Sequence, residues 1–247
     1  MTLIVAHRGA SAHAPENTIP SFELAVRQGA DAIELDVHLS ADGQVAVIHD
    51  ETLERTTTGS GSVASLTMDQ IRSLDAGARF GDGSFAGQGL RVPTLPEVLD
   101  WLPQGVGLVI EIKARTAVPS TVAAIAASRL AGSGDCSLVS FDEASIDAAR
   151  ELDPALTTGL LLVPSDRLER GMTYAVEHNH ALVLPFDGDL GLDPSMPLQM
   201  AAALGRRICP YGVEDPQRMQ QLAALGTWGI VTNAPDVAAR ALGRLST

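Results

Sequence analysis

The sequence predicts a (β/α)8 barrel, and three observations support that prediction. The chain has 247 residues, close to the roughly 250 residues of a typical barrel domain. Short apolar segments alternate with helix-like stretches bounded by turn residues, which is the pattern of repeated βα units. Nine such segments are expected, and one of them returns after a tight turn to form a hairpin. The other eight are the number of strands in a closed (β/α)8 barrel. No linker or internal repeat interrupts the pattern, so residues 1–247 are expected to form a single domain.

The expected strands are short segments rich in β-branched residues or leucine. They cover 3–6, 32–37, 45–48, 108–112, 137–140, 158–162, 182–184, 207–209 and 229–232. A well-marked helix joins the first two: Thr18 can cap its first turn, Pro20 suits that turn, and Gly29 ends the helix. A strand, a helix and a second strand in so short a stretch predict a parallel βαβ unit.

The second and third segments are expected to pair as an antiparallel hairpin, because too few residues separate them for a parallel crossover. Asp42-Gly43 is a strong signal for a two-residue hairpin loop. If these two residues form the loop, Asp36 lies opposite His49.

Residues 51–93 contain no clear strand–helix unit and are rich in glycine and serine. We interpret them as a small insertion that follows the second strand and its hairpin and caps one face of the barrel. Ser65 and Asp69 suggest one short helix within it, over 67–74. Two helices with apolar residues at helical spacing, over 217–225 and 235–245, are expected to end the chain.

Charge and cysteine usage exclude several functions. Lys and Arg number 17 against 30 Asp and Glu, a formal net charge of −13, so nucleic acid and anionic membranes are poor partners. Cys136 and Cys209 each stand alone, without the spacing of a disulfide framework or a zinc cluster, and are expected to be buried thiols. The N-terminus has no signal-like basic region before its short apolar run, which predicts a cytoplasmic protein. The oligomeric state is left open.

Two predicted strands place charged side chains on one face. Residues at i and i+2 of a strand point the same way, so Glu34 shares a face with Asp36, and Glu111 with Lys113. Inside a barrel, these charges would be costly unless they compensate one another or bind an ion. Structural ion pairs are one interpretation. The other is a site for one divalent cation, Mg²⁺ or Ca²⁺, because hard cations prefer oxygen ligands.

Two histidines end strands at the same predicted edge. His7 ends the first strand and His49 ends the hairpin, and the carboxyl ends of barrel strands are where barrel enzymes place catalytic groups. A single histidine at a strand end is usually only a polar terminus, but two beside carboxylates suit acid–base catalysis. Arg8 and Lys113 could bind phosphate oxygens. The residues alone thus predict a metal-dependent hydrolase or lyase acting on a phosphate ester.

Five short motifs follow one another along the chain. They are AHRG at 6–9, PENT at 15–18, IELDV at 33–37, IHD at 48–50 and EIK at 111–113. In this order they resemble the glycerophosphodiester phosphodiesterase family. The resemblance implies a TIM barrel with a small insertion that hydrolyses small glycerophosphodiesters, such as glycerophosphocholine or glycerophosphoethanolamine, to glycerol 3-phosphate and an alcohol.

The resemblance also implies residue roles. Carried over position by position, the metal ligands are Glu34, Asp36 and Glu111, the acid–base residues are His7 and His49, and the phosphate contacts are Arg8 and Lys113. Near the end of the chain, the family's usual Trp-Thr-Val-Asn is YGVE at 211–214. Tyr211 is expected to bind substrate as an aromatic wall of the pocket.

The expected mechanism is in-line displacement at phosphorus, with one histidine as base and the other as acid. The sequence does not decide which histidine takes which role. It also does not decide whether the nucleophile is water or the glycerol 2-hydroxyl. A phospholipase-type enzyme would need an apolar or basic rim to contact a membrane. The low aromatic content of 4% and the net charge of −13 argue against such a rim. A non-catalytic barrel would be favoured by loss of His7 or His49, and both are present. Phe80, Phe85 and Leu90 of the insertion could instead form a protein-docking patch.

Overall fold

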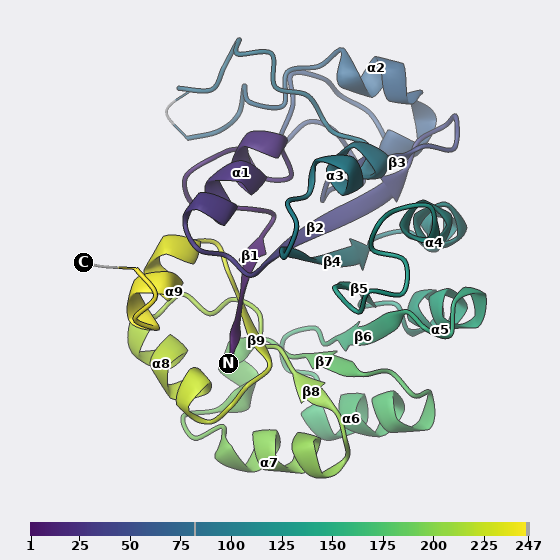
Figure 1. The fold of residues 1–247 in the computed structure, drawn as a ribbon. Helices are drawn as coiled ribbons and strands as arrows, with labels where there is room; N and C mark the ends of the chain where they lie inside the picture. Colours follow the sequence, from purple (N-terminus) through teal and green to yellow (C-terminus); the bar gives the residue numbers. More distant parts are fainter. Residues whose placement is uncertain (82, 246–247) are drawn as a thin grey trace.

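Eight parallel strands form a ring with helices outside it in the computed structural model (Figure 1). The structure describes residues 1–81 and 83–245. Asp82, inside the predicted insertion, and residues 246–247, at the end of the predicted domain, lie outside the described residues. The strands are β1 (Leu3–His7), β2 (Ala32–Leu39), β3 (Val45–Val47), β4 (Gly107–Ile112), β5 (Cys136–Ser140), β6 (Thr157–Leu161), β7 (Leu182–Leu184), β8 (Arg207–Ile208) and β9 (Gly229–Thr232).

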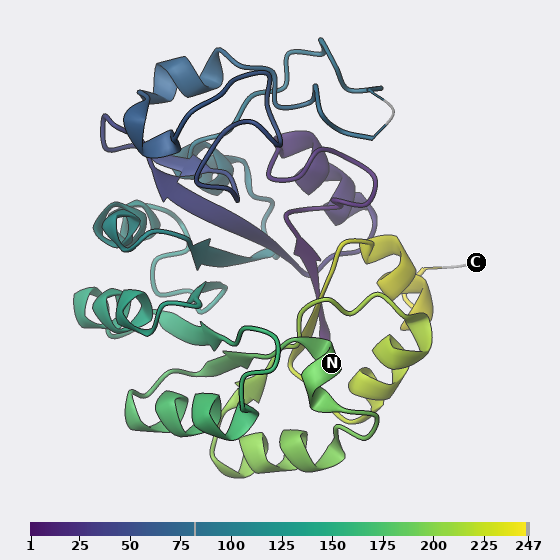
Figure 2. The same cartoon turned by 180° about the vertical axis from the view of Figure 1, so that it is seen from behind.

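The helices alternate with the strands along the chain and cover the outside of the ring, as the front and back views show (Figures 1 and 2). They are α1 (Ile19–Arg27), α2 (Met68–Arg72), α3 (Leu95–Trp101), α4 (Val118–Ala126), α5 (Glu143–Leu152), α6 (Leu168–Glu177), α7 (Ser195–Ala203), α8 (Pro216–Ala224) and α9 (Pro235–Ala241). None of the described helices combines the length and the apolar character that crossing a membrane requires.

Hydrogen bonds run around the ring in the order β8-β7-β6-β5-β4-β2-β1-β9. Contacts of residues next to the two end strands close it: Tyr211, three residues after β8, forms a parallel bridge with Val231, and the N–H of Trp228, directly before β9, donates to the Ile208 carbonyl at 3.1 Å. The predicted (β/α)8 barrel is therefore confirmed.

The first crossover helix begins and ends as predicted. The Thr18 hydroxyl accepts from the Ser21 N–H at the start of α1, and Gly29 follows its end with a φ of 87°. Phe22 is fully buried on the inner face of α1, with its ring centroid 6.0 Å from that of Trp101 on α3. This packing fixes α1 against the barrel, so the loop between β1 and α1 is held at both ends.

The hairpin of β2 and β3 is antiparallel as predicted, but its register differs by one residue. Val37 pairs with Val47, and Ile48, not His49, donates its N–H to the Asp36 carbonyl at 3.0 Å. The predicted pairing of Asp36 with His49 is wrong because the loop has three residues, not two. Gly43 closes that loop with a φ of 79°, the left-handed residue that such loops need.

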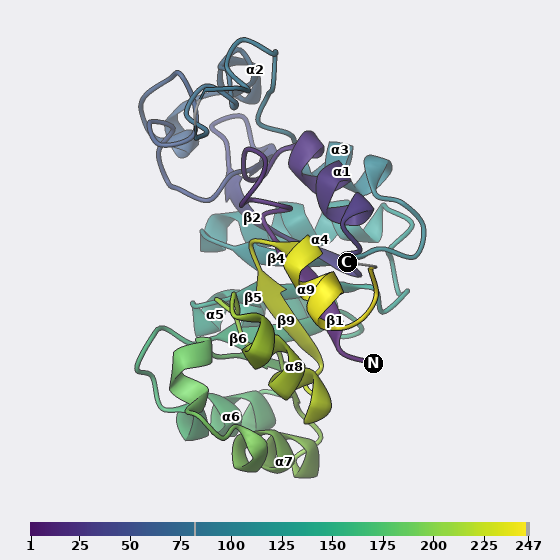
Figure 3. The same cartoon turned by 90° about the vertical axis from the view of Figure 1, so that its left-hand side faces the viewer.

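The insertion lies at one edge of the barrel, next to α1 and α3 and far from α7 (Figures 1 and 3). Its short helix, α2, is capped by Thr67 and Gln70 rather than by Ser65, which lies in a preceding 3-10 turn. The predicted range 67–74 is thus two residues too long at its end. The insertion has a small core of its own over β3, made of Ala46, Ile48, Leu53, Val63, Met68, Ile71, Ala76 and Val92.

The remaining elements follow the sequence predictions. Helices α8 and α9 correspond to the two expected at the end of the chain. Cys136 and Cys209 are both free thiols and both buried, as predicted.

Candidate active site

Three carboxylates meet where β2 and β4 lie side by side. Glu34 and Asp36 share one face of β2, and the parallel register puts Asp36 beside Glu111 of β4. One oxygen from each of the three lies within 4.8 Å of the others, and all three side chains are buried. The strand periodicity therefore brings together the three residues that the sequence analysis had selected.

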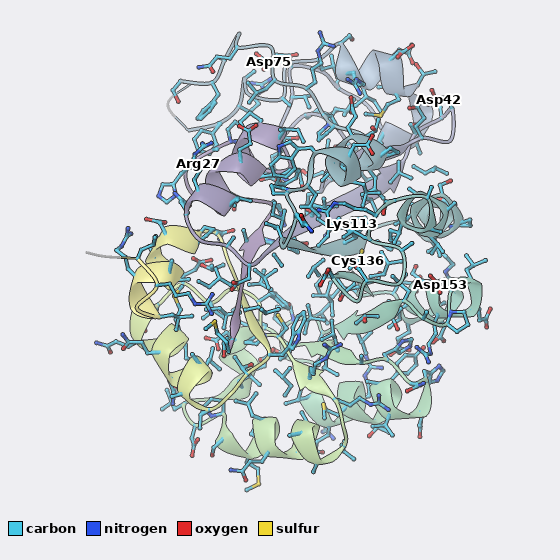
Figure 4. The ribbon with its side chains drawn as sticks, in the orientation of Figure 1. Arg27, Asp42, Asp75, Lys113, Cys136 and Asp153 are labelled. Atoms are coloured by element: carbon cyan, nitrogen blue, oxygen red, sulfur yellow. The ribbon has the colours of Figure 1, made fainter. Side chains whose placement is uncertain are left out.

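Asp36 is the best-compensated of the three. Its carboxylate lies 3.2 Å from Arg8 Nε and 3.1 Å from Lys113 Nζ, and it accepts a 2.8 Å hydrogen bond from Asn17 Nδ2. Burial alone would raise the pKa of Asp36, but Lys113 and Arg8 outweigh it and lower the pKa to about 2. Figure 4 shows Lys113 beside β2 and β4, inside the ring of helices.

The other two carboxylates carry charge that the described residues compensate less well. Burial, together with repulsion from Asp36, raises the pKa of Glu111 to about 7. Burial and the same repulsion raise the pKa of Glu34 well above its ordinary value. Lys113, which lies 3.1 Å from Asp36 Oδ1, and Arg8 are two cations against three carboxylates. An all-oxygen set with surplus negative charge fits a hard dication.

A chain of hydrogen bonds orients His7. Asn233 Nδ2 donates to Glu214 Oε1 at 2.9 Å, which leaves Asn233 Oδ1 to accept from His7 Nδ1 at 2.7 Å. The unprotonated Nε2 of the neutral ring then lies 4.0 Å from Glu34 Oε2. Burial, and secondarily Arg8, lower the pKa of His7 and favour this neutral form.

His49 has a charged partner instead. Its Nδ1 donates to Asp50 Oδ1 at 2.6 Å, and Arg55 Nε donates to the other oxygen of Asp50 at 2.6 Å. Burial lowers the pKa of His49, while Asp36 and Asp50 partly offset that effect. Arg55 also bonds to Glu16, which binds Arg8, so one ion-pair network spans the site.

The loop after β1 is strained where it enters the site. Arg8 and Asn17 have φ angles of 55° and 56°, in the left-handed region that side-chain-bearing residues seldom adopt. This turn lets the Arg8 N–H donate to Glu34 Oε2 at 3.0 Å. Glycine is required at Gly9, where φ is 85° and a Cβ atom would lie 2.4 Å from Ser21 Oγ.

These groups border a cavity of about 160 Å³. One side is polar and is formed by His7, Arg8, Glu34, His49, Glu111 and Lys113, and the other is apolar and is formed by Val139, Phe141, Leu161, Leu184, Tyr211 and Val231. Tyr211 lies on the apolar side, where its hydroxyl donates to the Leu162 carbonyl at 2.8 Å and its ring meets that of Phe141 edge-on at 6.1 Å. Burial raises the pKa of Tyr211 to about 12, so the phenol stays protonated.

Comparison with known proteins identifies the family of this chain. The model of the glycerophosphoryl diester phosphodiesterase family matches residues 7–237. The chain belongs to this family. A glycerophosphodiester phosphodiesterase of Caldanaerobacter subterraneus subsp. tengcongensis is 34% identical to it, over 95% of each chain.

Solved structures agree with the family assignment. A glycerophosphodiester phosphodiesterase from Agrobacterium tumefaciens strain C58 superimposes with a TM-score of 0.83 and 34% identity, covering 97% of this chain and 100% of that one. A phosphodiesterase from Oleispira antarctica, solved with its product sn-glycerol-3-phosphate, superimposes with a TM-score of 0.85 and 25% identity, covering 98% and 97%. The resemblance drawn from the sequence motifs is thus confirmed, and the chain is a phosphodiesterase of this family.

The candidate active site also contains three residues to which the sequence motifs assign no role. Asn17 binds Asp36, Asp50 binds His49, and Asn233 binds His7. Asn17 lies in the motif PENT and Asp50 in the motif IHD, so their places in these motifs could have indicated that they belong to the site. His38, two residues after Asp36 on β2, is also buried, and its Nε2 donates to the His49 carbonyl at 3.0 Å.

Proposed function

We propose that this phosphodiesterase hydrolyses glycerophosphodiesters such as glycerophosphocholine and glycerophosphoethanolamine to glycerol 3-phosphate and an alcohol, with one divalent cation, Mg²⁺ or Ca²⁺. The observation that carries the proposal is one small cavity lined by two histidines, two cationic side chains and two carboxylates, with the third carboxylate, Asp36, buried directly beside them. The product found in the Oleispira antarctica relative supports the choice of substrate. A small-molecule substrate, no nucleic-acid partner and a cytoplasmic location belong to the same proposal.

Glu34, Asp36 and Glu111 would hold the cation. When bound there, it would withdraw charge from a non-bridging phosphate oxygen. It would also neutralise the repulsion that raises the pKa values of Glu34 and Glu111. Binding of the cation and preparation of the site for an anionic substrate are therefore coupled.

Arg8 and Lys113 bind the phosphate group in this proposal. Both lie beside Asp36 and border the cavity. Their positive charges share the negative charge that grows on the phosphoryl oxygens in the transition state. Because both side chains are anchored by Asp36, little reorganisation is needed when the substrate binds.

The two histidines divide the proton transfers. His7 is the base, because its neutral partner Asn233 leaves an unprotonated Nε2 available to the attacking oxygen, water or the glycerol 2-hydroxyl. His49 is the acid, because its charged partner Asp50 favours a protonated ring more than the neutral partner of His7 does, and the leaving alkoxide takes that proton. Tyr211 and Phe141 provide an apolar wall for the glycerol or for the alcohol.

The test is a coupled assay for released glycerol 3-phosphate across several glycerophosphodiesters, with and without chelator. We expect turnover of at least one of them, loss of turnover in chelator, and recovery on addition of Mg²⁺ or Ca²⁺. A metal-loaded enzyme that releases no glycerol 3-phosphate from any of them would contradict the proposal. A ³¹P NMR time course separates the two nucleophiles, since only attack by the 2-hydroxyl forms a cyclic phosphate.

A second assay tests the roles of the histidines. A phosphodiester with a nitrophenolate leaving group needs no proton donor, so it should restore turnover to His49→Ala but not to His7→Ala. Rescue of His7→Ala alone would reverse the assignment.

A further inference from the structure

A second cluster of potential metal ligands lies on the outside of the barrel, between neighbouring helices α5 and α6 (Figure 1). Asp147 belongs to α5, and His178 and His180 follow the end of α6. We call these three residues the Asp147 cluster. Both histidines directly precede β7 and contact Asp147, so the cluster lies toward the amino ends of the strands. The candidate active site is built at the carboxyl ends.

Both histidines point at one carboxylate oxygen. His178 Nδ1 and His180 Nε2 each lie 3.0 Å from Asp147 Oδ1. In a tetrahedral zinc site with bonds of about 2.0–2.1 Å, neighbouring ligand atoms are about 3.3 Å apart. Two of the three pairs of ligand atoms thus nearly have the spacing of such a site before any ion is bound, and all three atoms lie within 4.8 Å of one another.

Surrounding groups hold each member of the cluster in place. The Tyr174 hydroxyl donates to Asp147 Oδ2 at 2.7 Å, and its ring stacks on that of His178 with centroids 4.0 Å apart. Thr158 Oγ1 lies 2.8 Å from His180 Nδ1. A hydroxyl can donate or accept, so Thr158 can accept a hydrogen bond from the Nδ1–H of His180 when Nε2 of the same ring binds an ion.

We propose that Asp147, His178 and His180 bind a second divalent cation, of the zinc class. Two imidazole nitrogens and one carboxylate oxygen favour zinc over Mg²⁺ or Ca²⁺, which prefer all-oxygen sites. Binding displaces the ring protons that now bridge to Asp147. His180 is fully buried, but the side chains of Asp147 and His178 are 31% and 40% exposed, so the ion can enter and water can occupy a fourth position.

This site would join elements that are distant in the sequence. Asp147 lies on α5, while the two histidines lie between α6 and β7. A bound ion would therefore cross-link neighbouring βα units on the outer face, away from the substrate. It would stabilise the folded chain without taking part in phosphodiester hydrolysis.

The test measures Zn²⁺ binding to the full chain by equilibrium dialysis, with saturating Mg²⁺ present. The variant Glu111→Gln removes a carboxylate from the active site, and the wild-type protein and this variant should both keep the outer zinc. His178→Ala should lose it, whereas His13→Ala, an exposed histidine 3.8 Å from Asp236, is the matched control and should keep it. Thr158→Val, which alters only the partner of His180, should weaken binding about 10- to 100-fold.

Three outcomes would overturn the proposal. One is a Glu111→Gln variant that binds no zinc. Another is a His178→Ala variant that binds zinc as tightly as His13→Ala does. The third is an unchanged melting temperature with added zinc in the Glu111→Gln variant, because an ion bound only by the folded state must stabilise it. His178 is exposed, so its replacement should leave the fold intact, which circular dichroism checks.

Discussion

Replacing Glu214 with alanine tests the hydrogen-bond chain that orients His7. Glu214 touches no substrate-facing atom of the cavity, yet its carboxylate accepts from the Thr232 hydroxyl and from both the backbone and side-chain N–H groups of Asn233. Without it, the Asn233 side chain keeps only His7 and the Ser11 hydroxyl, which donates to its Oδ1 at 2.8 Å. Because a hydroxyl can also accept, the amide can then turn and present Nδ2 to His7. The ring would then be held with its proton on Nε2, which is the wrong tautomer for a base.

The size of the effect follows from the contacts that are lost. A hydrogen bond to a charged group contributes about 1.5–3 kcal/mol, and the exposure of Glu214 reduces that to about 1–2 kcal/mol for its hold on the Asn233 side chain. A barrier raised by that amount slows the reaction about 5- to 30-fold. We expect the loss in kcat and kcat/KM alike, because orientation of His7 matters in the transition state.

The assay is steady-state release of glycerol 3-phosphate by Glu214→Ala, with Glu214→Gln and Glu151→Ala alongside. Glu214→Gln keeps an acceptor oxygen, so its rate should fall less than that of Glu214→Ala. Glu151 is exposed on α5, so the rate of Glu151→Ala should equal that of the wild type. Since His7 is the proposed base, a nitrophenolate leaving group should not restore the rate. A Glu214→Ala enzyme within about twofold of wild type would refute the orientation argument.

Four further predictions concern the ion, the histidines, the aromatic wall and the core. Chelation should abolish turnover and Mg²⁺ or Ca²⁺ restore it; full activity in a sample that elemental analysis shows to be metal-free would contradict this. His7→Ala and His49→Ala should each cost about 10² to 10⁴ in rate, and the double variant far less than their product, so strictly multiplicative losses would argue against a coupled pair. Tyr211→Ala should raise KM, cost about 1–3 kcal/mol in kcat/KM and reorder the head groups without changing metal affinity; kinetics equal to wild type on every head group would place Tyr211 outside the substrate pocket. Phe22→Ala should lower the free energy of unfolding by about 3–5 kcal/mol, measured in urea, and a loss below about 1 kcal/mol would mean that α1 repacks.

The predictable part of the site rests on local periodicity. Alternation along a strand was enough to place Glu34 with Asp36, and Glu111 with Lys113, because side-chain direction in a strand is decided by the backbone alone. Parallel register then brought the two pairs together at one edge of the sheet. The fold class could be predicted for the same reason, since the alternation of apolar strand segments with helix-like stretches bounded by turn residues is local to each βα unit.

Features that depend on a loop conformation or a distant partner were not predictable in this way. Asp42-Gly43 suits a two-residue loop as well as the observed three-residue one. The observed register is accompanied by contacts with the insertion, namely the packing of β3 and the Met68 N–H that donates to Asp42 Oδ1 at 2.9 Å. Asn233 and Glu214 follow different strands, and their contact exists only once the barrel closes. The sequence motifs include Asn17 and Asp50, but a motif does not show which atoms these side chains bind.

The strained turn at Arg8 and Asn17 has a consequence for evolution and engineering of this enzyme. Two left-handed residues with side chains cost of order 1–3 kcal/mol each, which the rest of the fold must offset. Glycine at either position would relieve that strain, but it would remove the guanidinium or the amide that binds Asp36. A library sorted for heat resistance alone would therefore enrich inactive clones at these two positions, whereas sorting for turnover as well would keep them unchanged and find its gains elsewhere in the barrel.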